Sequence, residues 1–227
     1  TIHEQLRIPA EILIGHPKQD NFDSTDVDWK KFPVKEMQKR GWFDVDLAEG
    51  KSGEQLIRSF FARTSAQSAP VLLRKTLTGV TKEENQYAIY AWVARVLIRA
   101  RDLKKPEVRY VPGSITDEFL KQLAKLSRSV DGPKIAAEFL AMKGVILVIE
   151  PHLPKTKLDG AAMLDQDGTP VIGLTLRYSR VDYFWFTLMH ELIHVQRHLS
   201  RQSSTFVDED DLDNEDEREA EANFLAA

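Results

Sequence analysis

The stretch RVDYFWFTLMHELIHVQRH, residues 180–198, decides the fold and the chemistry that we expect of this chain. Its apolar residues recur at helical spacing, which predicts one amphipathic helix through His198. Ser179, with Asp182 three residues later, can form a capping box at the start of that helix. Within the helix, HELIH places His190 and His194 about 40° apart around an axis of 3.6 residues per turn. Both imidazoles can therefore reach one metal ion on the same face.

Glu191, between the two histidines, has a different predicted role. It is turned about 100° from His190, so it is a poor third ligand but can reach a water held by the ion. This is the arrangement of a zinc hydrolase, in which the ion lowers the pKa of its water towards ~7 and polarises the scissile carbonyl. Glu191 then takes the proton of the attacking water and passes it to the leaving amine. The opposing interpretation, two surface histidines on an amphipathic helix, is less favoured because a strand pair precedes the motif and a glutamate-rich helix follows it.

The third ligand is not set by the motif itself, although a catalytic zinc usually has three protein ligands. Ser200 occupies the position at which an HExxHxxGxxH pattern needs its third histidine, which excludes that class of protease. His198 lies about 12 Å in axial rise from His190, which suits a flanking or supporting residue better than a shared ligand. The remaining candidates are carboxylates of the last helix, which is expected to begin at about Glu215: Glu215, Glu217, Glu219 and Glu221.

Helix signals recur before this stretch. Pro33 and Gly41 bound a first helix, and Ser52 can cap a second. Residues 84–101 are apolar on most sides, which is typical of a buried helix. A further helix, capped by Asp131, should end at Gly144. Its expected apolar stripe is Ile135, Phe139 and Met142. The basic cluster that ends the 84–101 helix is expected to be a solvated helix end rather than a nucleic-acid patch: Arg95, Arg99, Arg101, Lys104 and Lys105.

Strand signals are confined to the final third. VILVI at 145–149 predicts a short buried strand, and AAMLDQDGTPVIGLTL at 161–176 predicts two strands joined near Asp167-Gly168. A polar, acidic loop is expected between the HELIH helix and the last helix. Asp208, Asp210 and Asp211 lack the glycine and the spacing of a calcium loop, so a solvated connector is expected there. Together these elements predict an α+β fold with a mainly helical N-terminal region, a small β-sheet and an HExxH helix.

Composition agrees with an ordinary globular chain. Of the 227 residues, 42% are hydrophobic and 29% charged, which excludes collagen-like, mucin-like and wholly disordered classes. No apolar run approaches the ~20 residues of a membrane span. Cysteine is absent, so a metal must be held by imidazole and carboxylate, and a cytoplasmic location without membrane partners is expected. The net charge of −4 is uneven: residues 202–227 carry ten acidic residues and one basic residue, and the rest of the chain is basic.

The C-terminal part resembles the ImmA/IrrE family of metallopeptidases, which implies a zincin-like (gluzincin-type) domain. The resemblance rests on the HELIH helix, on EAEANFLA at 219–226 and on the two upstream sheet segments. It implies Zn²⁺ held by His190, His194 and Glu219, with Asn223 one turn later orienting a ligand. Glu221, turned away by about 200°, is the poorer candidate.

The N-terminal part has a looser resemblance to HigA-type antitoxin regulators. IHEQLRIPAEILIG (2–15) is similar to the closing segment of a helix-turn-helix domain, and DWKKFPVKEMQKRGWF (28–43) to the region that follows it. The resemblance implies that DNA is bound only through an N-terminal domain missing from this chain. We therefore expect a helix-turn-helix remnant and linker start at 1–17, a mainly helical connector at 18–106 and the metallopeptidase domain at 107–227.

Two functions remain open on this evidence. The first is a zinc endopeptidase that cuts a repressor-like protein as part of a transcriptional regulator. An extended substrate could then pair with an edge strand near residues 171–175, and Tyr178 or Arg180 could steady the oxyanion. The second is a toxin–antitoxin module that binds a cognate toxin with little or no catalysis. Whether the chain forms a homodimer is left open.

Overall fold

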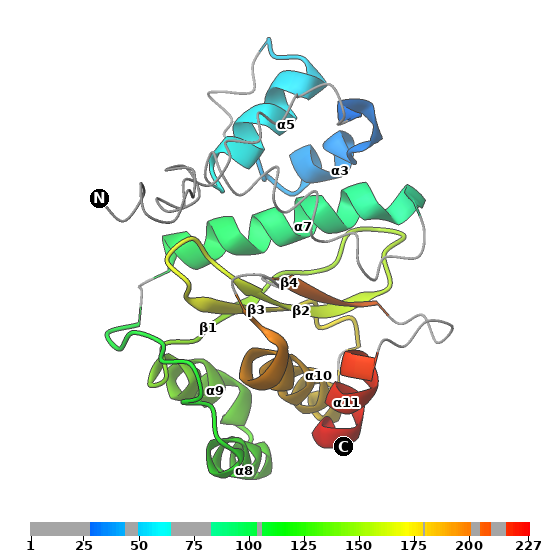
Figure 1. The fold of residues 1–227 in the computed structure, drawn as a ribbon. Helices are drawn as coiled ribbons and strands as arrows, with labels where there is room; N and C mark the ends of the chain where they lie inside the picture. The colour runs from blue at the N-terminus through cyan, green and yellow to red at the C-terminus, as the bar shows by residue number, and fades with distance from the viewer. Residues whose placement is uncertain are drawn as a thin grey trace, which may run out of the picture.

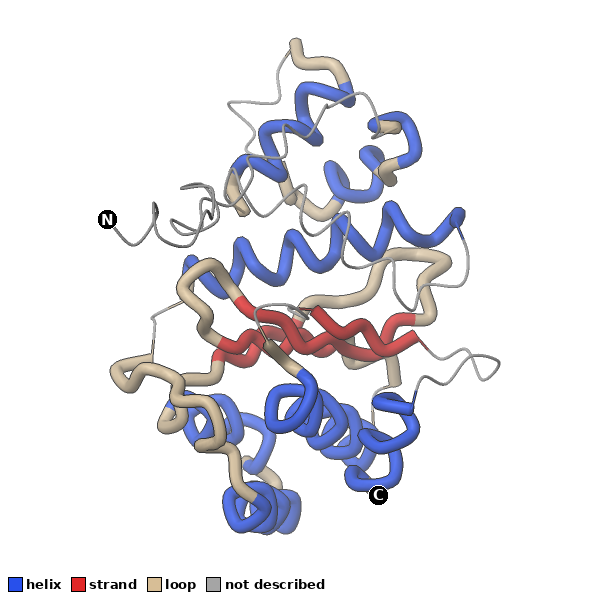
Figure 2. The backbone as a smooth tube through the Cα atoms, in the orientation of Figure 1, coloured by secondary structure: helices blue, strands red, loops and turns tan. Residues whose placement is uncertain are grey.

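The structure, a computed structural model, describes residues 28–43, 50–64, 83–103, 106–178, 180–200, 205–209 and 217–227. Helices and one four-stranded sheet alternate along these residues, so the expected mixed α+β character is confirmed (Figures 1 and 2). The helical elements are η2 (Trp29–Lys31), α3 (Val34–Lys39), α5 (Gly53–Ala62), α7 (Glu83–Asp102), α8 (Asp117–Lys125), η3 (Leu126–Arg128), α9 (Gly132–Ala141), α10 (Val181–Ile193), the π-helical turn η4 (His194–His198) and α11 (Glu217–Ala226). The strands are β1 (Ile146–Ile149), β2 (Leu158–Leu164), β3 (Pro170–Leu174) and β4 (Thr205–Glu209).

The sheet has the strand order β1-β3-β2-β4. β2 and β3 form the predicted hairpin, whose turn contains Gly168 at φ +79°, a conformation that favours glycine. β1 pairs parallel to β3, and β4 pairs antiparallel to β2 with Phe206 opposite Ala162. The sheet therefore has β1 and β4 as its edges. The expectation of an edge strand at residues 171–175 is wrong, because β3 is flanked on both sides.

Both faces of the sheet are buried, and each belongs to a different core. Side chains alternate along a strand: on β2, Ala161 and Met163 join the core under α7, whereas Ala162 joins the core formed with α10. Figure 1 shows the resulting layers, with α3 and α5 outermost, then α7, the sheet, and α9, α10 and α11 on the opposite face.

Helix α7 is the buried helix that the sequence predicts, and it spans the sheet. Trp92 and Val93 are fully buried, and the Trp92 indole Nε1 donates to the backbone oxygen of Glu150 (2.8 Å), just beyond β1. Two arginines near the end of α7 also contact Glu150. Arg99 Nη1 donates to Glu150 Oε2 (3.0 Å), and the Arg95 guanidinium lies 3.6 Å from the same carboxylate oxygen. These two side chains tie α7 to the strand end, so the interpretation as a merely solvated helix end is wrong for them.

The local start and stop signals of the first helices are confirmed. Ser52 accepts from the backbone N–H of Gln55 while the Gln55 side chain accepts from the Ser52 backbone N–H, a complete capping box. Helix α3 follows Pro33, and Gly41 takes φ +66° just after it.

Helix α9 begins and ends near the predicted residues, but its apolar stripe is displaced. Ile135 and Met142 are exposed (40% and 63%), and the buried residues Ala136 and Leu140 face the core instead. The helix is apolar enough that two faces compete as the buried one, and packing against η3, β1 and α10 decides between them. Asp131 stands at the N-cap position without a side-chain cap hydrogen bond.

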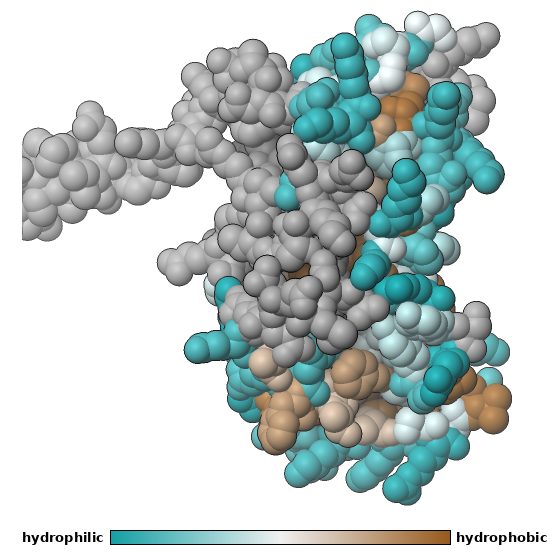
Figure 3. Space-filling view, turned by 90° about the vertical axis from the view of Figure 1, so that its right-hand side faces the viewer, coloured by the Kyte–Doolittle hydropathy of each residue, from teal (hydrophilic) through white to brown (hydrophobic). Residues whose placement is uncertain are grey.

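The described surface is mostly polar. Figure 3 shows it largely teal, with brown areas mainly in the lower part, the half that contains α8 to α11 in Figure 1. The exposed large apolar side chains include Phe186 on α10, and Phe224 and Leu225 on α11. No helix among the described residues is long and apolar enough to cross a membrane.

Candidate metal centre

Helix α10 buries the HELIH motif against the sheet. His190 and Glu191 are fully buried and His194 is 1% exposed. The burial follows from the apolar residues that share the helix, since Leu188 just before the motif and Leu192 within it both belong to the core. Arg180 stands at the N-cap position, whereas Ser179, expected to form a capping box, lies outside the described residues. The last turn of the expected helix is η4, in which the Leu199 backbone N–H donates to the His194 oxygen (2.7 Å).

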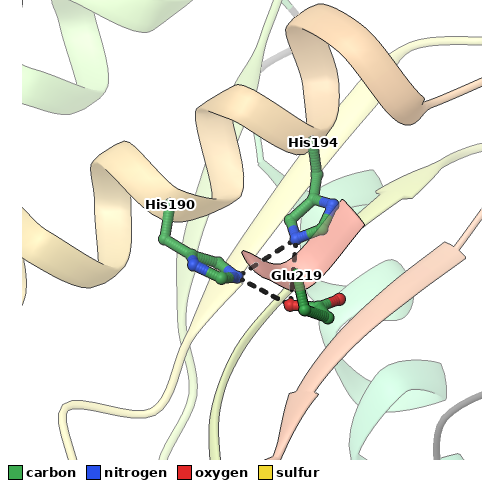
Figure 4. Close-up of side chains that lie close together, drawn as sticks. All are labelled: His190, His194 and Glu219. Carbon is green, nitrogen blue, oxygen red and sulfur yellow. Dashed lines mark hydrogen bonds and ion pairs between the residues drawn. The ribbon is translucent and has the colours of Figure 1, made fainter. Parts of the chain in front are cut away.

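His190, His194 and Glu219 meet at one point, between α10 and α11 (Figure 4). The two imidazole Nε2 atoms are 3.1 Å apart, and Glu219 Oε2 lies 3.1 Å from that of His190 and 3.3 Å from that of His194. Three ligands at zinc-bond lengths on a tetrahedron would be about 3.4 Å apart. The spacing and the chemistry of the three donor atoms therefore fit a zinc ion with nitrogen and oxygen ligands.

Protonation in this group also suits a metal. Burial lowers the pKa of His194, against the opposing effect of the Glu219 carboxylate, so the imidazole is neutral at pH 7. Burial alone would raise the pKa of Glu219, but the two imidazoles beside its carboxylate, those of His190 and His194, outweigh burial and lower that pKa to about 2. The cluster therefore presents a neutral His194 imidazole and an anionic Glu219 carboxylate, the forms that bind a metal.

Asn223 lies where the resemblance placed it, one turn after Glu219. Its Oδ1 is 3.0 Å from His190 Nδ1. Because an amide oxygen only accepts hydrogen bonds, His190 carries its proton on Nδ1 and keeps the Nε2 lone pair for the metal group. A hydrogen bond of this kind fixes the tautomer and the ring orientation of a ligand histidine.

Glu191 points toward strand β2. A Cβ atom built on Gly160 would lie 2.5 Å from Glu191 Oε1 and 3.1 Å from its Cγ, so the carboxylate occupies space that only a glycine leaves open. Sequence reasoning missed this contact. The signal was a lone glycine inside a strand pattern, which often marks a close approach.

The structure does not place the other glutamate candidates in the group formed by His190, His194 and Glu219. Glu221 hydrogen-bonds His198 Nε2 through Oε2 (2.9 Å) and pairs with Arg197 through Oε1, so it is engaged beside the metal group rather than in it. Glu217 is exposed at the start of α11, and Glu215 lies outside the described residues. His198 approaches His194 through Nδ1 (3.0 Å), which agrees with a supporting rather than a ligating position.

Strand β4 contributes a neighbour that the sequence analysis did not anticipate. Phe206 stacks on the His194 ring (centroids 4.8 Å apart, interplanar angle 17°), and the Arg218 guanidinium carbon lies over the Phe206 ring, 5.2 Å from its centroid. The expectation of a continuous acidic loop after the HELIH helix is therefore wrong at 205–209; residues 210–216, with Asp210 and Asp211, lie outside the described residues. The signal was the run Thr-Phe-Val, which favours a strand.

The two residues suggested for the oxyanion are engaged elsewhere. Arg180 pairs with Asp182 at the helix start, about 15 Å in axial rise before His190. The Tyr178 ring packs against Tyr183 (centroids 4.6 Å apart).

Comparison with known families supports the metal-centre interpretation. Residues 141–227 match the sequence model of a peptidase family (Peptidase_M78), described as the IrrE N-terminal-like domain. The matched part is similar to a zinc metallopeptidase type and contains the sheet, α10 and α11. No curated protein and no solved structure matches the chain.

Proposed function

We propose that this chain is a zinc-dependent endopeptidase that cuts a regulatory, repressor-type protein. The observation that carries the proposal is the convergence of His190, His194 and Glu219, whose donor atoms lie within 4.8 Å of one another, beside the buried Glu191. The match of residues 141–227 to a metallopeptidase family supports it independently. The role as part of a HigA-type transcriptional regulator belongs to the same proposal and rests on the N-terminal resemblance.

Three residues would hold the metal, and Glu191 would transfer the protons. His190, His194 and Glu219 would hold Zn²⁺, which when bound supplies a Lewis acid that acidifies water and polarises the scissile carbonyl. Glu191 takes the proton of the attacking water on its carboxylate and returns it to the amine nitrogen as the C–N bond breaks. Asn223 keeps the His190 ring in the tautomer that presents Nε2.

A protein substrate would need an extended segment beside this group. Of the two edge strands, β4 carries Phe206 against His194, so a substrate strand added to β4 would pass close to the metal group. This replaces the earlier expectation at β3.

The test is cleavage of a candidate repressor by the zinc-loaded protein beside Glu191→Gln. We expect the variant to lose at least ~10²-fold in rate, the usual contribution of a general base. It should still bind one zinc per chain, because Glu191 is not among the three donors. Equal cleavage by the variant and the wild type would refute the role of Glu191 as the general base.

A second function, binding of a cognate toxin with little catalysis, is favoured by one observation. His190, Glu191 and His194 are at most 1% exposed, so a substrate must displace covering groups before it reaches them. Tight complex formation with a toxin, unchanged in Glu191→Gln and in a Glu219→Ala variant that binds no zinc, would support this function over the first.

A further inference from the structure

His194 has a close polar contact at each ring nitrogen, and the outer contact continues to the surface. Nε2 faces His190 and Glu219, whereas Nδ1 lies 3.0 Å from Nδ1 of His198. His198 then reaches Glu221 Oε2 through Nε2 (2.9 Å), and Arg197 holds the other oxygen of that carboxylate. The chain of contacts runs from a ligand imidazole that is 1% exposed to a carboxylate whose side chain is 39% exposed.

The hydrogens in this chain have only one arrangement that leaves His194 able to bind a metal. A neutral imidazole carries one N–H, so a lone pair on His194 Nε2 requires the hydrogen on its Nδ1. That hydrogen points at His198 Nδ1, which must accept it. His198 therefore carries its own hydrogen on Nε2, facing a carboxylate oxygen that can only accept.

The π-helical turn η4 contains the two histidines of this arrangement, one at each end. It begins at His194 and ends at His198, and the Leu199 backbone N–H donates to the His194 oxygen in the i→i−5 pattern of a π-turn. A turn of this kind is found where helices end, and here the extended backbone of Leu199 follows it at once. The turn also presents Arg197 to the same carboxylate, so one short segment carries both partners of Glu221.

We infer that His198 and Glu221 are positioning residues, which fix the tautomer and ring orientation of His194 for the metal. The inference deepens the proposed function and rests on the zinc site that it assumes. It gives His194 the same kind of support that Asn223 gives His190, and it assigns a role to a carboxylate that does not ligate. Orienting contacts of this kind typically contribute 10–100-fold to metal affinity.

Zinc affinity, measured by competition with a chelator, tests the inference in matched variants. His198→Phe keeps a flat ring but cannot accept a hydrogen bond, and we expect it to bind zinc ~10–100-fold more weakly. His198→Gln offers an amide oxygen to the same N–H and should recover most of the loss. Glu221→Ala should weaken binding, and Glu221→Gln should weaken it less. Gln122→Ala, which removes an exposed side chain of α8 bonded to Glu118, is the control and should bind as the wild type does.

A tautomer measurement gives a readout that a merely structural role would not change. Long-range ¹H–¹⁵N spectra of histidine-labelled, zinc-loaded protein should show the hydrogen on Nδ1 of His194 and on Nε2 of His198. Wild-type affinity in His198→Phe, or a His198 hydrogen on Nδ1, would overturn the inference. Thermal unfolding without zinc shows whether His198→Phe folds. If it does not fold, the zinc affinity of Glu221→Ala and the tautomers of His194 and His198 in the wild type test the inference. Absence of zinc binding by the wild type would instead refute the proposed function. The His198 tautomer in zinc-free protein would still test the chain of contacts from His194 to Glu221.

Discussion

At the scale of single residues, the position of the general base depends on a residue with no side chain. Glu191 is fully buried, and its carboxylate lies against Gly160 of β2, where a Cβ would come within 2.5 Å of Oε1. Glycine weakens a strand interior, so its use there is explained by the close approach. Strand β2 therefore forms the wall that holds the Glu191 carboxylate in place.

Gly160→Ala should therefore impair catalysis far more than metal binding. The added methyl group forces the carboxylate out of its position, and we expect cleavage to fall by ~10²-fold, approaching the loss of a general base. Zinc affinity should stay within a few-fold, because the three atoms nearest to the added methyl group all belong to Glu191 and none of them is a metal-donor atom. Gly173→Ala is the matched control: it also overfills the sheet, but against Trp92 on the opposite face, and should lower thermal stability without a selective loss of cleavage. Equal losses of activity in the two variants would contradict the assignment.

Metal binding should follow the titration of the imidazoles and not that of the carboxylate. The pKa of Glu219 is about 2, so it stays ionised over the useful range, whereas burial lowers the pKa of His194 below 6.5 and keeps the ring neutral at pH 7. A proton competes with zinc only for a neutral ring. We expect chelator competition to show little change in zinc affinity between pH 8 and 7. Below pH ~6 the affinity should fall by up to ~10-fold per pH unit for each ring protonated. A loss confined to pH values below 4.5 would identify the carboxylate as the limiting group instead.

At the scale of elements, local signals were sufficient where the chain itself determines the structure. The capping box at Ser52, the hairpin turn at Gly168 and the apolar run of α7 depend on neighbours in sequence, and all three are present. Strand β4 was not predicted, because five residues inside an acidic segment form a strand only when β2 offers them an edge. The face that α9 buries is likewise chosen by packing.

In the metal centre, too, contacts within one helix were predictable from the sequence and contacts between elements were not. Spacing along one helix placed His190 and His194 on one face, and spacing along the last helix related Asn223 to Glu219. Spacing could not say which glutamate of α11 faces α10, since that depends on how two helices separated by more than twenty residues pack together. The contact between Glu191 and Gly160 has the same origin, because it joins a helix to a strand that precedes it by about thirty residues.

At the scale of the whole molecule, the sheet is shared by two cores, so neither side is a complete unit without it. The core on the α7 side combines Trp92 and Val96 with Val148, Met163 and Val171 from three strands. The division of domains at residue 106 stays a prediction, but α7, which lies before it, packs against β1 and β3 on the face of the sheet opposite α10 (Figure 1).

This shared core predicts that a shortened chain of residues 107–227 does not fold cooperatively. Removing α7 exposes at least four large apolar side chains of the sheet, each worth ~1.5–3 kcal/mol when buried. The sum reaches the total stability of an ordinary domain, about 5–15 kcal/mol. It also removes the indole and guanidinium contacts of Trp92 and Arg99 to Glu150. Thermal unfolding followed by circular dichroism should show a sharp transition for the full chain and for residues 28–227, and none for residues 107–227. A cooperative transition and full zinc affinity in the 107–227 chain would show that the metal-binding half is autonomous and that α7 is only an attachment.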